Sequence, residues 1–424
     1  MISPVTKMAP VLVSPSGPTP SGHLPLSCLD RVPVMRYFVE MFHVYNHGHE
    51  PAEAVRSALA KALVPYYPVA GRISNSDDGK LQVSCTGEGV WFVAASAACS
   101  LKDVEYMESE PFGISKEQLL PSPPPGVAQD DLIFMLQITE FECGGFVIGY
   151  IANHVFFDAI GVGQFIVAIG EMAKGLETPT TKPVWCREAI PNTFPLGIEL
   201  THSTAAAPPP PSRLEHHKMD LPLDGVNLLT NQYTKETGRR CSSFDVLAAM
   251  LWQCRTRAID LPPHADVSLD FPTNVRQKLR EELPAEGGYY GNCICEVLIE
   301  QTGAYIANAS LLEVITLIKD AKENLSTKFS RWLKGEPHVD KSPQQLVAYG
   351  SLCLTDLRRV GFYEADYGWG APDHVVPLFD YPIALCTILN SPPPMKGVRV
   401  LTQCVAKEHL QAFCDKMNKL ASLY

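Results

Sequence analysis

The clearest alternation of hydrophobic and polar positions lies between residues 131 and 173. Two apolar, β-rich runs at 131–139 and 146–152 are joined by a short polar stretch and predict a β-hairpin. Apolar residues then recur at helical spacing and predict a helix that begins just past Asp158. These residues are Val162, Phe165, Ile166, Ile169, Met172 and Ala173.

Two side chains with acid–base chemistry lie between the predicted strand end and the predicted helix. His154 leaves the strand, and Asp158 follows four residues later. A carboxylate directly before a helix can cap its free N–H groups and lies at the favourable end of the helix dipole. The pair predicts a general base, His154, on a loop that Asp158 supports. A buried structural histidine is the alternative.

The His-x-x-x-Asp spacing alone carries little information. A chain with 12 histidines should contain roughly half a match by chance, and a second match, His216 to Asp220, is present. His216 follows a proline-rich stretch in a polar region that offers no strand or helix to hold it. The context therefore favours His154.

Both halves of the chain mix helical and strand patterns, which indicates an α/β fold with two lobes. Further helices are predicted at 51–63, 244–254, 305–325 and 409–423, and strands at 81–85 and 90–95. A length of 424 residues exceeds the size at which one core stops growing.

Of three proline-rich stretches, at 121–126, 205–212 and 391–394, the middle one is the longest and lies near the midpoint of the chain. We therefore expect an N-terminal lobe at 1–195, a linker at 196–220 and a C-terminal lobe at 221–424. A segment near 370–390 that crosses back to the N-terminal lobe is left open.

Composition and charge exclude several classes of protein. A net charge of -11 without a dense Lys/Arg block argues against nucleic acid or an anionic membrane as partner. The chain shows no signal peptide and no apolar run of 18 residues, so we expect a cytoplasmic protein without a membrane span.

Thirteen scattered cysteines are expected to be reduced, with Cys293 and Cys295 at alternate positions of one strand. Metal, serine-hydrolase and nucleotide-binding motifs are absent, so no bound metal is expected.

Several ordered motifs resemble those of the plant BAHD acyl-CoA-dependent acyltransferases. Their H-x-x-x-D signature matches residues 154–158, and D-Y-G-W-G at 366–370 resembles their D-F-G-W-G signature. Further similar segments are L-S-x-L-D at 26–30, Y-Y-P-V-A-G-R at 66–72, N-x-R at 274–276 and Y-Y-G-N at 289–292. The resemblance spans the chain and looks most like the branch of alcohol benzoyl-, acetyl- and hydroxycinnamoyltransferases. The sequence departs from the family pattern at two positions. Tyr367 replaces the usual Phe, and Ala371 stands where many members carry Lys or Arg. The second departure weakens the case for a cofactor-binding cation at position 371.

The resemblance implies two chloramphenicol-acetyltransferase-like lobes, each a mixed β-sheet with flanking helices, and an active-site channel between them with His154 at its centre. His154 would act as general base on an acceptor that attacks acyl-CoA in a ternary complex. Acyl-CoA is then a co-substrate, and no permanently bound cofactor is implied. The acceptor is a small plant metabolite, with an alcohol as first choice and an amine as alternative. A monomer is expected, as in most relatives.

The family also implies roles for residues outside the histidine. Its aspartate points away from the catalytic centre and pairs with an arginine, so Asp158 is expected to pair with Arg276. Asn274 precedes that arginine in the N-x-R element.

Two roles are open for Trp369. Its indole N–H would donate to the oxyanion, or the residue would belong to a structural turn with Asp366, Gly368 and Gly370. We favour the structural role, because the family segment lies away from the catalytic histidine.

Coenzyme A carries phosphates, which helix N-termini and basic side chains bind. Ser242 and Ser243 open a predicted helix directly after Arg239 and Arg240, so these four residues are candidate contacts for coenzyme A. The alternative is that the serines only cap the helix and the arginines are solvated. Two other functions are also open, an acyl-CoA-binding protein without turnover and a thiol-dependent hydrolase.

Overall fold

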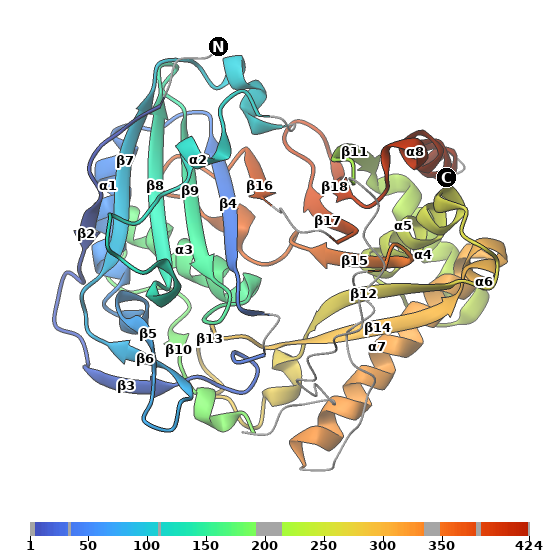
Figure 1. Ribbon diagram of the computed structural model, residues 1–424, viewed down its shortest axis with the longest axis horizontal. Coiled ribbons are helices and arrows are strands. Elements are labelled where there is room, and N and C mark those ends of the chain that lie inside the picture. The colour runs from blue at the N-terminus through green and yellow to red at the C-terminus, as the bar shows by residue number, and fades with distance from the viewer. Residues whose placement is uncertain are drawn as a thin grey trace. The chain divides into compact units, whose positions relative to one another are not determined.

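A computed structural model describes residues 5–32, 35–108, 112–191, 214–334, 348–378 and 383–422. The chain divides into two compact units (Figure 1). Unit 1 comprises Met1–Phe194, Leu279–Cys293 and Arg358–Phe379, and unit 2 comprises Pro195–Lys278, Ile294–Leu357 and Asp380–Tyr424.

The boundaries expected from the sequence differ from these units in two places. Leu279–Cys293 and Arg358–Phe379 belong to unit 1, although both fall within the range 221–424 expected for the C-terminal lobe. The second of them overlaps the segment near 370–390 for which a return to the N-terminal lobe is left open. Of the predicted linker at 196–220, residues 196–213 lie outside the described residues. Strand β11 (His217–Pro222) begins within its last residues.

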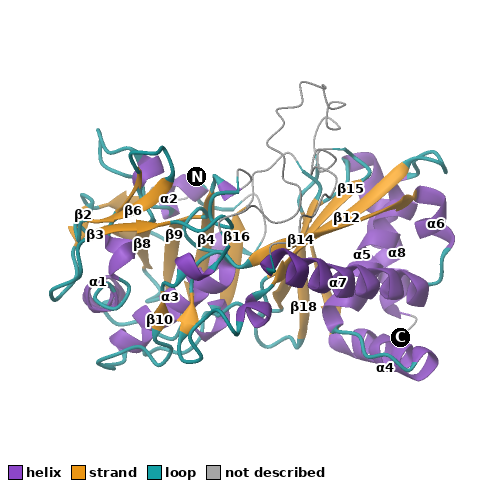
Figure 2. Cartoon of the chain, turned by 90° about the horizontal axis from the view of Figure 1, so that it is seen from below, coloured by secondary structure: helices purple, strands orange, loops and turns teal. Residues whose placement is uncertain are grey.

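Unit 1 is built on a mixed sheet with the strand order β1-β7-β8-β9-β4-β16, in which β2 also pairs with β7. These strands are β1 (Val5–Lys7), β2 (Val11–Val13), β4 (Phe38–Tyr45), β7 (Val90–Ala97), β8 (Phe134–Phe141), β9 (Phe146–Asn153) and β16 (His374–Leu378). Strands β7 and β8 run parallel, and the other pairs run antiparallel. Helices α1 (Pro51–Ala62) and α3 (Ala159–Ala173) lie side by side against the sheet (Figure 2).

Smaller elements complete unit 1. A second sheet contains β3 (Gly22–Pro25), β6 (Leu81–Cys85) and β5 (Arg72–Asn75), and β10 (Pro183–Val184) pairs with β13 (Gly288–Tyr289). A short helix, α2, covers Lys116–Leu119. Single helical turns of unit 1 lie at Tyr67–Ala70, Lys102–Met107, Gln129–Asp131, Arg187–Ala189 and Phe362–Glu364, and a further turn, Arg276–Leu279, spans the passage from unit 2 to unit 1.

Unit 2 contains a second mixed sheet, with the order β11-β18-β17-β15-β12-β14. Its strands after β11 are β12 (Asp266–Asn274), β14 (Ile294–Thr302), β15 (Ser351–Asp356), β17 (Leu385–Asn390) and β18 (Gly397–Gln403). The helices are α4 (Leu223–Thr237), α5 (Ser243–Ile259), α6 (Gly303–Asn308), α7 (Leu311–Leu333) and α8 (Lys407–Ser422). Helix α5 is almost fully buried and contacts α4, α7 and α8. Two mixed sheets with helices confirm the predicted α/β class.

Most elements agree with the hydrophobic pattern. Strands β8 and β9 form the predicted antiparallel hairpin, and α3 begins at Ala159 with Asp158 as its N-cap. The helix predicted at 305–325 is instead two helices, α6 and α7. The break arises because Ser310 and Glu313 form a capping box that starts α7.

The cysteines give a mixed result. All 13 are free thiols, as predicted. The prediction that Cys293 and Cys295 share a strand is wrong by one residue, because β14 begins at Ile294 and contains only Cys295.

Three glycines of α3 explain how the chain segments of unit 1 pack on this helix. A Cβ atom at Gly161 would overlap the carbonyl oxygen of Tyr290, and one at Gly163 would overlap that of Val360. A Cβ at Gly170 would crowd the carbonyl oxygen of Asp366. The absence of side chains therefore lets the backbones of 279–293 and 358–379 approach α3 closely.

None of the helices within the described ranges is both long and apolar enough to cross a membrane.

Candidate active site

His154 follows the last residue of β9 and is held through its main chain. Its N–H donates to the carbonyl oxygen of Tyr37 at 3.0 Å, and the Tyr37 ring lies 4.7 Å from the imidazole between centroids. The residue is only 8% exposed. Its Nδ1 atom is buried and has no hydrogen-bond partner among the described residues. Among the described residues, no carboxylate therefore orients the His154 imidazole through a hydrogen bond to Nδ1.

Burial lowers the pKa of His154 below the ordinary value of 6.5, although its own backbone and Asp158 act in the opposite direction. The imidazole is therefore neutral at pH 7 and can accept a proton, as a general base must.

This shift predicts the pH dependence of catalysis. A base with a lowered pKa stays deprotonated to lower pH, so activity is lost only as the pH falls through that lowered pKa. We expect kcat/KM to be flat near pH 7 and to fall on the acid side with an apparent pKa below 6.5. A profile from pH 5 to 8, with circular dichroism at each pH to exclude unfolding, measures this value. An acid limb centred above pH 7 would contradict it.

Asp158 makes structural contacts and is 2% exposed. One carboxylate oxygen accepts the N–H of Gly161 at 2.9 Å, and the other accepts the N–H of Cys293 at 3.0 Å. The predicted capping of α3 is thus confirmed. Arg276, which belongs to unit 2, donates through its N and Nη1 to the Asn274 side chain. Its pairing with Asp158 stays a prediction.

Asp158→Asn should damage stability more than base strength. The amide keeps one oxygen but turns its NH2 group toward the N–H of Gly161 or Cys293, which leaves a buried donor unpaired. We expect a loss of about 1–3 kcal/mol in the free energy of unfolding. Because the Asp158 charge raises the pKa of His154, we also expect the acid limb of kcat/KM to move to lower pH, with kcat on the plateau kept. Urea unfolding and the pH profile measure the two quantities. Unchanged stability with kcat abolished would show a direct chemical role instead.

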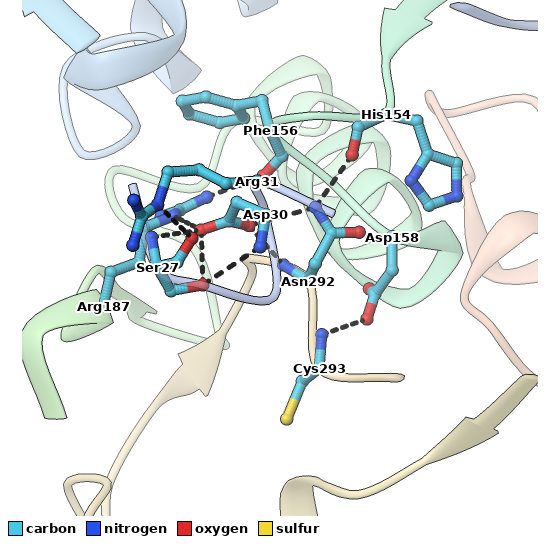
Figure 3. A network of polar contacts seen from close by, with 9 residues as sticks. All are labelled: Ser27, Asp30, Arg31, His154, Phe156, Asp158, Arg187, Asn292 and Cys293. Atoms are coloured by element: carbon cyan, nitrogen blue, oxygen red, sulfur yellow. Dashed lines mark hydrogen bonds and ion pairs between the residues drawn. The ribbon is translucent and has the colours of Figure 1, made fainter. Parts of the chain in front are cut away.

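A buried ion pair lies beneath the histidine loop (Figure 3). Arg187 Nε donates to Asp30 at 2.9 Å, and both side chains are fully buried. The same Asp30 oxygen accepts the N–H and hydroxyl of Ser27. Its other oxygen accepts both N–H groups of Asn292 at 3.0 Å. Arg187 Nη2 donates to the carbonyl oxygen of Phe156 at 2.6 Å, which ties the ion pair to the loop.

The sequence motifs contain Asp30 and Asn292 but assign them no role, and no motif contains Arg187. One local signal existed, because Ser27 and Asp30 have the spacing of a reciprocal cap, and Ser27 Oγ does accept the Asp30 N–H at 3.2 Å. Arg187 gives no such signal. Its guanidinium lies 3.8 Å from the centre of the Trp185 ring, in an aromatic environment that only the folded chain creates.

The D-Y-G-W-G segment is a turn closed by its own aspartate. One oxygen of Asp366 accepts the N–H groups of Gly368 and Gly370, each at 2.8 Å, and the other pairs with Lys174 at 3.1 Å. Both glycines have positive φ angles, 106° and 93°, which other residues rarely adopt.

Trp369 packs edge-on against Phe146, with 5.4 Å between ring centroids. Phe146 is the first residue of β9, whereas His154 follows the last one. At about 3.3 Å per residue, the two ends of the strand are separated by more than about 20 Å. The oxyanion role considered for Trp369 is therefore corrected in favour of the structural one.

The model of the Transferase family matches residues 3–420. The chain is 50% identical to myricetin 3-O-glucosyl 1,2-rhamnoside 6'-O-caffeoyltransferase AT2 of Crocosmia x crocosmiiflora, with 98% of each chain covered. It is 32% identical to 3'-N-debenzoyl-2'-deoxytaxol N-benzoyltransferase of Taxus canadensis, over 99% of this chain and 97% of the other. The chain belongs to the BAHD family of acyl-CoA-dependent acyltransferases.

Solved structures agree on the fold of this BAHD acyltransferase. Vinorine synthase superposes with a TM-score of 0.73 at 19% identity, with 98% of each chain covered. The predicted fold of two mixed-sheet domains is thereby confirmed.

The candidate contacts for coenzyme A in this acyltransferase have partners of their own. Ser242 accepts the N–H of Asp245 at 3.2 Å and caps α5, as predicted, while Ser243 is the first residue of the helix. Arg239 pairs with Asp320 at 2.8 Å and with Glu323 at 3.0 Å. Arg240 is exposed. Contact between these residues and coenzyme A stays a prediction.

The second His-x-x-x-Asp match is expected in a region without a strand or helix, and this prediction is wrong, because residues 217–220 of the match lie on β11 in the unit 2 sheet. Asp220 lies on β11 and accepts two hydrogen bonds from Arg399 of β18, each at 2.9 Å. Its carboxylate is therefore used between strands, which supports His154 as the base of this BAHD acyltransferase.

Proposed function

We propose that this enzyme transfers an aromatic acyl group of the hydroxycinnamoyl type from coenzyme A to a hydroxyl group of a glycosylated plant metabolite. The observation that carries the chemistry is the buried imidazole of His154, whose pKa is lowered by burial. The substrate classes rest on the caffeoyltransferase at 50% identity, whose name gives a myricetin glycoside as acceptor.

The reaction needs one base and no covalent enzyme intermediate. His154 takes the proton of the acceptor hydroxyl while the oxygen attacks the thioester carbonyl carbon. A carbon–oxygen bond forms and the carbonyl electrons move to oxygen. When they return, the carbon–sulfur bond breaks and the coenzyme A thiolate leaves. The imidazolium then gives its proton to the thiolate, which regenerates the neutral base.

Amide formation is the second candidate. The relative at 32% identity is named an N-benzoyltransferase, and the same neutral base serves an amine that loses its proton after attack. The geometry of His154 does not distinguish an alcohol acceptor from an amine acceptor. The chemical identity of the product, an ester or an amide, is therefore needed to distinguish them.

A thiol-dependent hydrolase has little support. Burial raises the pKa of Cys28 to about 12 and that of Cys85 to about 11. The pKa of Cys404 is lowered, because Cys386 and Arg255 outweigh its burial, but this thiol is fully buried. Reactive thiolates combine a low pKa with access to solvent. Cys28 and Cys85 lack the low pKa, and Cys404 lacks the access to solvent.

We further propose a cytosolic, monomeric enzyme. The free state of all 13 cysteines supports the location, because disulfides are rare in the reducing cytosol. The monomer follows the expectation for the family.

The test is thiol release from caffeoyl-CoA, benzoyl-CoA and acetyl-CoA, each combined with a flavonol glycoside, a simple alcohol or a primary amine. We expect the fastest acceptor-dependent release with caffeoyl-CoA and the glycoside, and a product whose mass and alkaline lability identify an ester. A hydroxylamine-stable amide from the amine would favour the second candidate. Release without an acceptor would favour a hydrolase, and tight acyl-CoA binding without release a binding protein.

A further inference from the structure

The orientation of His154 needs an explanation, because a general base acts only when its lone pair faces the proton. In many enzymes a carboxylate bonded to Nδ1 sets both the ring orientation and the tautomer. Here the Asp158 carboxylate is occupied by the N–H groups of Gly161 and Cys293. The Nδ1 atom of His154 has no partner within the described residues.

Asn292 holds the main chain of the base. Its Nδ2 atom donates to the carbonyl oxygen of His154 at 2.8 Å and to Asp30 at 3.0 Å. The N–H of His154 is bound by Tyr37 at the same time. Both backbone groups of the base are thus fixed, and Asn292 supplies one of the two anchors.

The amide oxygen of Asn292 is a buried acceptor, and like His154 Nδ1 it has no hydrogen-bond partner in the described parts of the chain. Figure 3 shows the Asn292 amide between the Asp30 cluster and the imidazole. Among the influences that oppose the burial of His154, the Asn292 side chain acts to raise its pKa, as a nearby acceptor does. The two atoms are not hydrogen-bonded to each other in the structure, but a bond between them would give each the partner it lacks.

We infer that Asn292 is a positioning residue for His154: its amide nitrogen holds the His154 carbonyl oxygen, and its unpaired amide oxygen is the acceptor available to the imidazole Nδ1–H. The neutral base then has its lone pair on Nε2, free for the proton of the acceptor. After proton transfer the same oxygen stabilises the imidazolium. This inference rests on the proposed function only for its effect on rate, since the tautomer of His154 is a property of the free enzyme.

Asp30 fixes the amide in this orientation. It accepts the backbone and side-chain N–H groups of Asn292, and a carboxylate cannot accept from the amide oxygen. The NH2 group must therefore face Asp30, which leaves the oxygen for His154. The contact with Arg187 in turn holds the Asp30 carboxylate in place.

Asn292→Ala is expected to lower kcat about 10²-fold, as a small misplacement of a catalytic group does, with KM for acyl-CoA changed less than about threefold. Because the Asn292 side chain raises the pKa of His154, its removal should also shift the acid limb of kcat/KM to lower pH. Loss of stability alone would not produce that shift. An unchanged kcat, or a lower kcat with an unmoved acid limb, would overturn the inference.

Gln137→Ala is the matched control. Gln137 is a fully buried amide in the same unit and also donates two hydrogen bonds, to Gln118 O and Thr139 Oγ1. It pairs with Gly149 in β9, away from the strand end that carries His154. We expect a comparable loss of thermal stability, with kcat and the pH profile of the wild type.

A second measurement uses the wild-type enzyme and does not depend on whether an Asn292 variant folds. Nitrogen-15 NMR of the wild type, with the His154 signals assigned by their absence from His154→Gln, reports which ring nitrogen carries the proton. The inference requires Nδ1–H, and an Nε2–H tautomer would overturn it. If the wild type lacks acceptor-dependent transfer while His154 is the Nδ1–H tautomer, the proposed function fails and the positioning contact stands.

Discussion

His154→Ala is expected to lower kcat by a factor of about 10²–10⁴, the usual contribution of a positioned general base. The acceptor would have to lose its proton to water, while binding of acyl-CoA keeps its other contacts. KM should therefore change little. The measurement is steady-state thiol release at saturating caffeoyl-CoA and acceptor, with the ester quantified by mass spectrometry.

His43→Ala is the control for removing a buried imidazole. His43 is 1% exposed and packs edge-on against Tyr150 and Phe362, and burial lowers its pKa to about 3. This variant should lose stability but keep kcat. If both histidine variants lose activity in proportion to their stability, or if His154→Ala retains more than a tenth of wild-type kcat, the general-base mechanism is refuted.

Arg187→Met should strongly destabilise unit 1. It leaves the Asp30 carboxylate buried without its counter-charge and removes the donor to the Phe156 carbonyl. Breaking one partner of a buried pair typically costs about 3–5 kcal/mol. Urea unfolding monitored by tryptophan fluorescence measures the loss in the free energy of unfolding.

The control for this prediction is an exposed pair. Arg56 and Glu53 approach to 2.6 Å on α1, with both side chains about half exposed or more, so Arg56→Met should cost no more than about 1 kcal/mol. The double variant Asp30→Asn with Arg187→Met should lose less than the sum of the single losses, because no unpaired charge remains. Equal losses for Arg187→Met and Arg56→Met would show that the buried pair contributes no more than a surface contact.

Features that depend on neighbours in sequence could be predicted. The hairpin of β8 and β9 follows from apolar runs, and the capping of α3 by Asp158 and of α5 by Ser242 follows from side chains three residues from the N–H they bind. Such signals are local, because capping and periodicity act within one or two turns.

Features that join distant parts of the chain could not be predicted in this way. Asp30, Arg187 and Asn292 are separated by more than 100 residues from one another, and no spacing rule connects them. The glycines at 161 and 163 could have signalled a close backbone approach, but not which segment approaches. The family resemblance supplied motifs containing Asp30 and Asn292, yet gave neither their atoms nor their partners.

The peptide bond from Cys293 to Ile294 is one of the places where the chain passes from unit 1 to unit 2. On one side, Cys293 N–H is bound by Asp158 and Asn292 holds the His154 carbonyl. On the other side, β14 begins at once and forms the edge of the unit 2 sheet. No loop residue separates the two segments. An insertion or deletion at this junction would therefore displace the Cys293 N–H that binds Asp158 and the Asn292 amide that binds the His154 carbonyl, or else change the register of β14.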